Sequence, residues 1–197
     1  MNKQAFIFIG RSGSGKGTQA ALLMEALEKE DASISSLYIQ TGQELRNFIN
    51  GNSYTQKIAK ELYESGGLFP EFLSVYQWVN VLVERCKGDE HLIFDGTPRR
   101  LHEAGVLNSI IGFYKFGKPW VIHLDVSHEQ AFKRLTLRHR LDDDVKDIKR
   151  RLAWYDTEVL PTVDYYRNNS NYNFLEINGE RPIEEIHADI VKKLALS

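Results

Sequence analysis

The sequence predicts an α/β fold in which a five-stranded parallel sheet is covered by helices on both faces. Short apolar runs rich in β-branched and aromatic residues alternate along the chain with longer amphipathic segments. Such alternation is typical of parallel sheets, because each parallel connection is long enough to hold a helix. A glycine-rich segment also separates the first apolar run from the first helical pattern, at residues 10–18.

The predicted strands are the apolar runs at residues 5–9, 36–39, 91–94, 120–124 and 173–177. Helical spacing of apolar residues predicts helices over residues 15–30, 42–50, 54–65, 71–87, 101–115, 127–139, 143–168 and 182–195. Ser127 and Gln130 have the spacing of a capping box, and Pro182 stands at the first turn of the last helix. Residues 41–87 are longer than one crossover needs, so we expect a helical insertion within a single domain spanning residues 1–197.

Composition limits the classes of protein to which the chain can belong. The chain has 197 residues, 42% hydrophobic and 26% charged, which excludes wholesale disorder. A formal net charge of −2 gives no global attraction to nucleic acid or to an anionic membrane. The lone Cys86 excludes an intramolecular disulfide, and no apolar run is long enough for a membrane span or a signal peptide. We therefore expect a cytoplasmic protein, a monomer or small homo-oligomer, that binds neither nucleic acid nor membrane.

The segment GRSGSGKGT at residues 10–18 has the spacing of a phosphate-binding loop. Its glycines let consecutive backbone N–H groups turn toward one centre, and the N-terminus of the following helix adds positive potential. Lys16 would bring a full charge to the β- and γ-phosphates, and the hydroxyl of Thr18 or Ser14 would lie near a magnesium ion. The alternative is a glycine-rich turn without a ligand, but a strand before it and a helix after it favour the phosphate site.

Five further segments carry glycine-rich or charged motifs. They are TGQELR at residues 41–46, GLFP at 67–70, DGTPRR at 95–100, RLDD at 140–143 and NGERPI at 178–183. Arg134 and Arg138 are four residues apart and share one helix face, and Arg151 follows on the next helix. Taken singly, each segment is equally well explained as a surface turn or a solvated basic face. Together with the phosphate loop, they resemble the motifs of the adenylate kinases, a family of nucleoside-monophosphate kinases, from residue 5 to about residue 195.

This resemblance implies a three-layer P-loop kinase fold with a monophosphate-binding insertion. It also implies that MgATP and a nucleoside monophosphate bind end to end for reversible phosphoryl transfer, ATP + AMP = 2 ADP, with Mg²⁺ as the cofactor. Two alternatives remain open. One is a kinase for GMP, CMP or UMP, and the other is a P-loop regulatory protein that binds nucleotide and turns over slowly. The arginines expected to converge on one site favour an enzyme.

The resemblance assigns roles to individual residues. The electrostatic clamps of the transfer would be Lys16, Arg99, Arg134, Arg138, Arg140 and Arg151. ATP would be bound by Gly13, Ser14, Gly15, Lys16, Gly17, Thr18, Arg134, Arg138 and Arg181. The monophosphate would be bound by Thr41, Gly42, Arg46, Gly67, Leu68, Phe69, Gly96, Arg99, Glu103, Arg140 and Arg151. The metal would be held by Asp95, through water, and by Thr18.

The sequence departs from the family pattern in its lid and at Glu103. Only His139 separates Arg138 from Arg140, so the lid is reduced to about residues 138–140. Glu103 stands where the family has a glutamine whose amide donates to and accepts from adenine. An ionised carboxylate only accepts and suits guanine better, whereas a protonated one restores the amide's pattern. The alternative is that Glu103 points to solvent beside Arg100 and reads no base.

Overall fold

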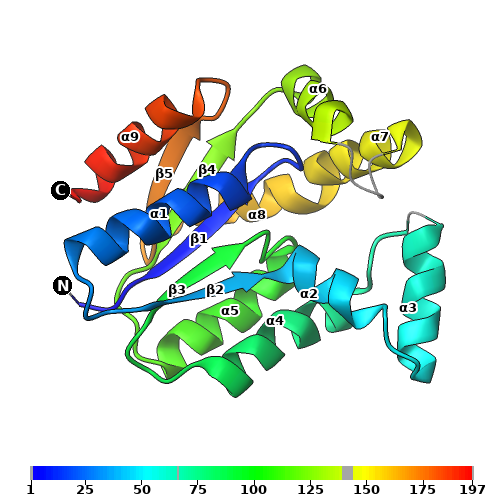
Figure 1. The fold of residues 1–197 in the computed structure, drawn as a ribbon, viewed down its shortest axis with the longest axis horizontal. Coiled ribbons are helices and arrows are strands. Elements are labelled where there is room, and N and C mark those ends of the chain that lie inside the picture. Colours follow the sequence, from blue (N-terminus) through cyan, green and yellow to red (C-terminus); the bar gives the residue numbers. More distant parts are fainter. Residues whose placement is uncertain (1, 66, 139–143, 197) are drawn as a thin grey trace.

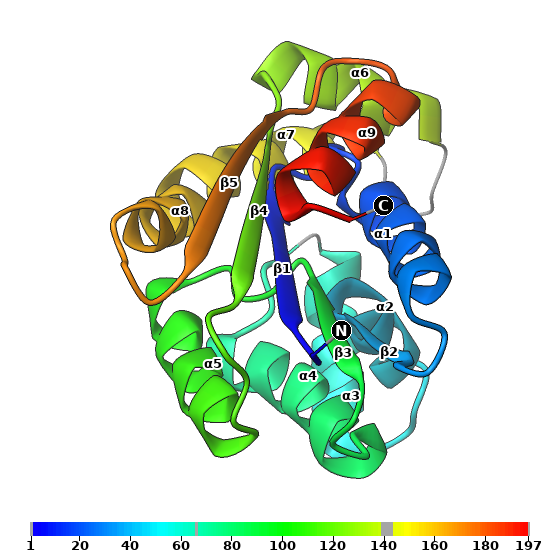
Figure 2. The same cartoon turned by 90° about the vertical axis from the view of Figure 1, so that its left-hand side faces the viewer.

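The structure is a computed structural model that describes residues 2–65, 67–138 and 144–196. Five parallel strands form one sheet in the order β2-β3-β1-β4-β5, which confirms the predicted fold class (Figures 1 and 2). The strands are β1 (Ala5–Gly10), β2 (Ser36–Gln40), β3 (His91–Asp95), β4 (Trp120–Asp125) and β5 (Asn173–Asn178). Each runs one residue further toward its carboxyl end than the sequence predicts. Because β1 is central, the loop that follows it leaves the sheet between β3 and β4.

Helices connect the strands and cover both faces of the sheet. They are α1 (Lys16–Glu30), α2 (Thr41–Phe48), α3 (Tyr54–Glu64), α4 (Glu71–Arg85), α5 (Leu101–Phe113), α6 (His128–Arg138), α7 (Val145–Trp154), α8 (Leu160–Arg167) and α9 (Ile183–Leu194). On one face, α1 and α9 cover Phe6 and Phe8. On the other, α4, α5 and α8 cover Ile7 and Ile9 (Figure 2). Trp78 of α4 lies in this second core, so α4 belongs to the layer on the sheet as well as to the stretch between β2 and β3.

The single helix predicted over residues 143–168 is interrupted. Between α7 and α8 lies a π-helical turn, η1 (Tyr155–Val159), in which the backbone N–H of Leu160 donates to the carbonyl of Tyr155. Pro161 has no backbone N–H to donate and stands in the first turn of α8. A wider turn before proline accommodates the missing hydrogen bond, which hydrophobic spacing alone does not reveal.

Two further local predictions need correction. The N–H of Gln130 donates to Ser127 Oγ at 3.3 Å, but the N–H of Ser127 donates to Glu180 at 2.9 Å instead of to Gln130. The capping box is therefore only half formed, and its second bond joins the start of α6 to the turn after β5. Pro182 precedes α9 as its N-cap residue instead of lying in the first turn.

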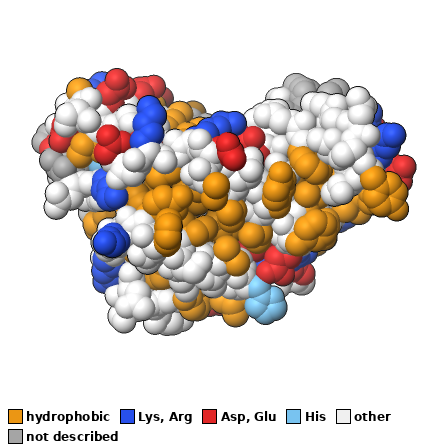
Figure 3. Space-filling view, turned by 90° about the horizontal axis from the view of Figure 1, so that it is seen from below, with side chains coloured by type: hydrophobic (Ala, Val, Ile, Leu, Met, Phe, Trp, Pro, Cys, Tyr) orange, Lys and Arg blue, Asp and Glu red, His pale blue; other side chains and the backbone are white. Residues whose placement is uncertain are grey.

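The face formed by α4 and α5 carries exposed apolar side chains (Figure 3). The most exposed are Phe72, Tyr76 and Val83 of α4 and Phe113 of α5. In the described part of the chain, no helix combines the length and hydropathy that crossing a membrane requires.

Candidate functional site

A cavity of about 1100 Å³ opens at the carboxyl ends of β1, β2 and β3. This is the edge at which parallel α/β sheets bind ligands. The residues after β1 form its floor, and residues of α2, α4 and the loop 67–69 form one wall. Residues of α6, α7 and η1 form the opposite wall. In Figure 1, these walls lie around the right-hand end of the sheet.

The loop between β1 and α1 takes the backbone course that its glycines predict. Gly15, the N-cap residue of α1, has φ +94°, a conformation that other residues rarely adopt. At Gly17, a Cβ atom would lie 3.3 Å from Asp95 Oδ2, so a side chain there would crowd the carboxylate. The loop therefore brings the N-terminus of α1 and the end of β3 within contact distance.

Lys16 lies inside this loop. Its Nζ donates to the carbonyl oxygens of Gly10 at 2.9 Å and Arg11 at 2.8 Å. Burial lowers the pKa of Lys16 to about 8, helped by the positive charges of Arg99 and Arg138 and opposed by Asp95. An anion beside the ammonium would relieve this unfavourable burial of charge, so the loop is suited to bind one.

Asp95, at the end of β3, is fixed by two neighbours from β2. Tyr38 donates its hydroxyl to Asp95 Oδ2 at 2.7 Å, and Gln40 donates its amide to the same oxygen at 3.2 Å. Among the described residues, no group of three or more His, Cys, Asp or Glu side chains is arranged to hold a metal ion. One oriented carboxylate beside a phosphate loop is nevertheless the donor set that suits Mg²⁺, which keeps several waters and takes other ligands from phosphates.

The turn after β3 fixes Arg99 through its backbone. The N–H of Arg99 donates to Glu103 Oε2 at 2.7 Å, and its carbonyl accepts from Thr162 Oγ1 at 2.9 Å. The side-chain Nε donates to the carbonyl of Gly96 at 3.1 Å, which directs the rest of the guanidinium. Burial lowers the pKa of Arg99 from its ordinary value, while Glu103 and Asp95 raise it, and arginine remains protonated under such opposing effects.

Glu103 is buried, with only 2% of its surface exposed, and lines the cavity. The alternative in which it points to solvent is therefore wrong. Burial raises the pKa of its carboxyl group, although the N–H of Arg99 and the charges of Arg99 and Arg100 lower it. Glu103 therefore lines the cavity while its Oε2 accepts from the backbone of the arginine turn.

The other predicted cations come from several elements. Arg46 on α2 donates to Gln43 at 2.8 Å. Arg134 on α6 reaches the carbonyl of Ser14 at 3.5 Å, and Arg181 pairs with Asp189 at 2.6 Å. Arg138 at the end of α6 and Arg151 on α7 also line the cavity. The cavity is therefore cationic on both sides of the phosphate loop.

Most residues assigned from the sequence lie on this cavity. The assigned residues that line it are Gly13, Ser14, Gly15, Lys16, Gly17, Thr18, Gly42, Arg46, Gly67, Leu68, Phe69, Asp95, Gly96, Arg99, Glu103, Arg134, Arg138, Arg151 and Arg181. Thr41 is buried at the start of α2 and is not brought to the cavity wall. Arg140 and the predicted reduced lid, apart from Arg138, lie outside the described residues.

Sequence reasoning missed several residues that shape the site. Tyr38 and Gln40 are two residues apart and therefore share one face of β2, but the predicted strand ended at residue 39 and left Gln40 out. No local sequence pattern indicates the roles of Arg11 and the π-helical turn, because their contacts join segments far apart in the chain.

Comparison with known proteins matches this arrangement to one family. A sequence model of the adenylate kinase family matches residues 8–171. The chain is 35% identical over 193 residues to an adenylate kinase of Prochlorococcus marinus (strain MIT 9515), which covers 98% of this chain and 100% of that protein. Relatives named adenylate kinase from Azobacteroides pseudotrichonymphae and Parabacteroides distasonis are 32% and 33% identical, over 190 and 188 residues. They cover 94% and 93% of this chain, and 94% of each relative. The resemblance predicted from the motifs is confirmed.

Proposed function

Because the chain belongs to the adenylate kinase family and is a phosphotransferase of the nucleoside-monophosphate kinase type, we propose that it catalyses ATP + AMP = 2 ADP. One observation carries this proposal. A single cavity joins the phosphate loop with Lys16 to a separate arginine turn at Arg99, with further arginines on its walls. A triphosphate and a monophosphate that meet end to end require such a distribution of cations.

The residues around the cavity act by charge and orientation. The attacking oxygen of a nucleoside monophosphate is already anionic, so no general base is needed. Lys16 stabilises the charge that develops on the transferring group, and Arg99 holds the acceptor phosphate. Asp95, oriented by Tyr38 and Gln40, would hold the Mg²⁺ that accompanies ATP through water. That ion would neutralise phosphate charge when bound.

The proposed roles divide along the cavity. The ATP side comprises the loop residues 13–18 with Arg134, Arg138 and Arg181. The monophosphate side comprises Gly42, Arg46, the loop 67–69, Gly96, Arg99, Glu103 and Arg151. We assign Arg140 to the transfer from the family motifs alone. Arginine suits the positions expected to contact phosphate, because its planar guanidinium can bind two phosphate oxygens at once.

The substrate assay tests the proposal. Purified protein is supplied with MgATP and each of AMP, GMP, CMP and UMP in turn, and nucleoside diphosphate formation is measured. AMP is expected to give the highest kcat/KM. Preference for another monophosphate would replace AMP as the acceptor but keep the reaction class. Tight ATP binding without transfer to any of the four would favour a regulatory nucleotide-binding protein.

Acceptor selectivity is expected to depend on the protonation of Glu103. Since burial raises the pKa of Glu103, its protonated form can donate to the adenine ring nitrogen as well as accept from the amine. Ionisation removes the donor, so the kcat/KM ratio of AMP to GMP is expected to fall as pH rises. Glu103→Gln, a permanent donor and acceptor, is expected to raise that ratio and remove its pH dependence. Unchanged ratios for all four acceptors would show that Glu103 does not contact the base.

ATP binding is expected to take up protons at alkaline pH. The pKa of Lys16 is about 8 without ligand, and adjacent phosphate oxygens would raise it. At about pH 8.5, part of the protein must therefore gain a proton on binding, and the Kd for ATP rises with further increase in pH. Calorimetry in two buffers of different ionisation enthalpy measures this uptake. Lys16→Arg, which stays charged, is the matched control. Equal uptake by both proteins would assign the proton to another group.

A further inference from the structure

Two ion pairs hold the π-helical turn η1 between the two loops of the site. Asp156 pairs with Arg11 of the phosphate loop at 2.8 Å, and Glu158 pairs with Arg100 of the turn after β3 at 2.7 Å. The two acidic residues are two positions apart on η1. A single short segment therefore contacts both the loop that follows β1 and the loop that follows β3.

Arg11 is held more firmly than an exposed ion pair would achieve. Its guanidinium carbon lies 4.2 Å from the centre of the Tyr155 ring, and its Nε donates to the carbonyl of Val126 at 3.1 Å. The side chain is only 18% exposed. Cation–π stacking and a fixed hydrogen bond add to the charge pairing when the arginine is largely desolvated. The backbone carbonyl of Arg11 accepts from Lys16 Nζ at 2.8 Å, so its anchoring bears directly on the lysine.

The turn after β3 is tied to the same region at two neighbouring residues. Arg100 donates its Nε to Glu158 at 2.7 Å, and the carbonyl of Arg99 accepts from Thr162 of α8 at 2.9 Å. Thr162 is fully buried. The residue that would hold the acceptor phosphate therefore has its backbone fixed by α8, and the next residue is fixed by η1.

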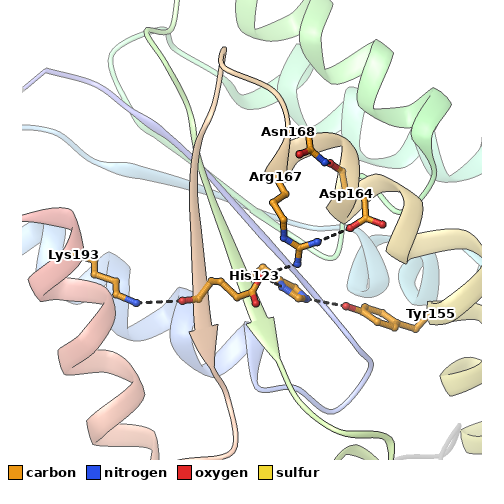
Figure 4. Close-up of polar contacts among 7 residues, drawn as sticks. His123, Tyr155, Asp164, Arg167, Asn168 and Lys193 are labelled. Carbon is orange, nitrogen blue, oxygen red and sulfur yellow. Dashed lines mark hydrogen bonds and ion pairs between the residues drawn. The ribbon is translucent and has the colours of Figure 1, made fainter.

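The turn η1 is itself anchored to the sheet through Tyr155. The tyrosine hydroxyl lies 2.8 Å from Nε2 of His123, a side chain that is 3% exposed within β4 (Figure 4). On the far side of the imidazole, Glu176 of β5 lies 3.7 Å from Nδ1 and pairs with Arg167 at 2.6 Å. The contact between Tyr155 and His123 is thus a buried one, because both side chains are almost fully shielded from solvent.

We infer that η1 sets the separation between the donor and acceptor phosphates, with Arg11 and Arg100 as the positioning residues that join it to the two loops. The inference rests on the proposed function, because it concerns the geometry of transfer between two bound nucleotides. The pairing of β1 with β3 sets the distance between the points where the two loops begin, and the two ion pairs of η1 fix the course of each loop beyond its strand. A displacement of about 1 Å between reacting groups costs on the order of a hundredfold in rate.

The test separates binding at each loop from the distance between the loops. Asp156→Ala, Glu158→Ala and the double variant are compared with wild type for the Kd of ATP, of AMP and of a pentaphosphate that joins two adenosines. The linked ligand spans both sites, so its affinity depends on their separation as well as on each site. In the double variant, we expect the affinity for the linked ligand to fall about tenfold and kcat to fall about tenfold. The Kd of ATP and of AMP should stay within about twofold.

Two matched variants control for the loss of an ion pair as such. Glu64→Ala removes the exposed pair with Lys60 on α3 and is expected to change none of these quantities. Asp156→Glu keeps the charge and is expected to retain both kcat and affinity for the linked ligand. If the double variant melts below the assay temperature, the single variants carry the test with proportionally smaller changes.

Each remaining outcome counts against the inference. Parallel losses for ATP, AMP and the linked ligand would mean that η1 only supports each loop. If the wild type transfers phosphate but the double variant binds the linked ligand as tightly as the wild type does, the inference is overturned and the proposed function stands. A wild type that transfers to no monophosphate would overturn the proposed function, and the inference with it.

Discussion

Replacing Lys16 with alanine is expected to lower kcat by about two to three orders of magnitude, equivalent to about 3–4 kcal/mol of transition-state stabilisation. Lys16 is the cation inside the phosphate loop, and its pKa of about 8 leaves it mostly protonated at neutral pH. Its charge is most useful when negative charge shifts across the transferring group. Steady-state kinetics with ATP and AMP measures the loss, and turnover within threefold of wild type would remove Lys16 from the site.

The same substitution is expected to leave the protein folded and to change how its stability depends on pH. The folded-state pKa of Lys16 is about 8, against an ordinary value of 10.5. Between these two values the unfolded chain binds more protons than the folded one, so the free energy of unfolding of the wild type rises with pH. The alanine variant lacks this contribution. Chemical denaturation at about pH 7.5 and about pH 9.5 measures it, with the same samples that are used for kinetics.

Arg99→Ala is expected to lower kcat/KM for the monophosphate by about two to three orders of magnitude. The backbone contacts of residue 99 with Glu103 and Thr162 persist in the variant, so the turn keeps its course while the guanidinium is lost. Arg99→Lys is expected to recover only part of the activity, because an ammonium cannot bind two phosphate oxygens in a fixed plane. The affinity for ATP alone should change little, which equilibrium binding measures.

Arg85→Ala is the matched control for Arg99→Ala. Arg85 is an exposed arginine at the end of α4, 4.0 Å from Glu44, and does not line the cavity. Its removal is expected to leave kcat/KM within about twofold, since exposed ion pairs contribute little. If Arg99→Ala behaved like Arg85→Ala, the acceptor phosphate would have to be held by other arginines.

Much of the fold could be predicted because its signals are local. Each strand was found to within one residue, since short buried runs of β-branched and aromatic side chains are recognisable without their neighbours. The helices were found nearly as well, except where Pro161 converts one long helix into α7, η1 and α8. That exception depends on how the surrounding packing accommodates the backbone N–H that Pro161 lacks, and hydrophobic spacing does not encode this.

The candidate site divides in the same way. Lys16 and Arg99 could be selected from the sequence because each lies within a short motif directly after a strand, and the carboxyl ends of parallel strands meet at one edge. The orientation of the Glu103 side chain could not be predicted from the sequence. Whether a glutamate at that position faces solvent or the cavity depends on the packing around α5 and on its bond to the N–H of Arg99. Burial then raises the pKa of its carboxyl group.

Local sequence specifies the alternation of strands and helices, the glycine-rich phosphate loop and the residues that follow each strand. Each depends on the periodicity or the backbone freedom of a few consecutive residues. The contact by which Tyr38 orients Asp95, and the ion pairs by which η1 joins Arg11 to Arg100, arise from the packing of the whole fold. Those contacts pair side chains many tens of positions apart, such as Arg100 and Glu158, which are 58 apart. Their geometry is set by the strand order β2-β3-β1-β4-β5 and by close packing of the core, neither of which is written in any local segment.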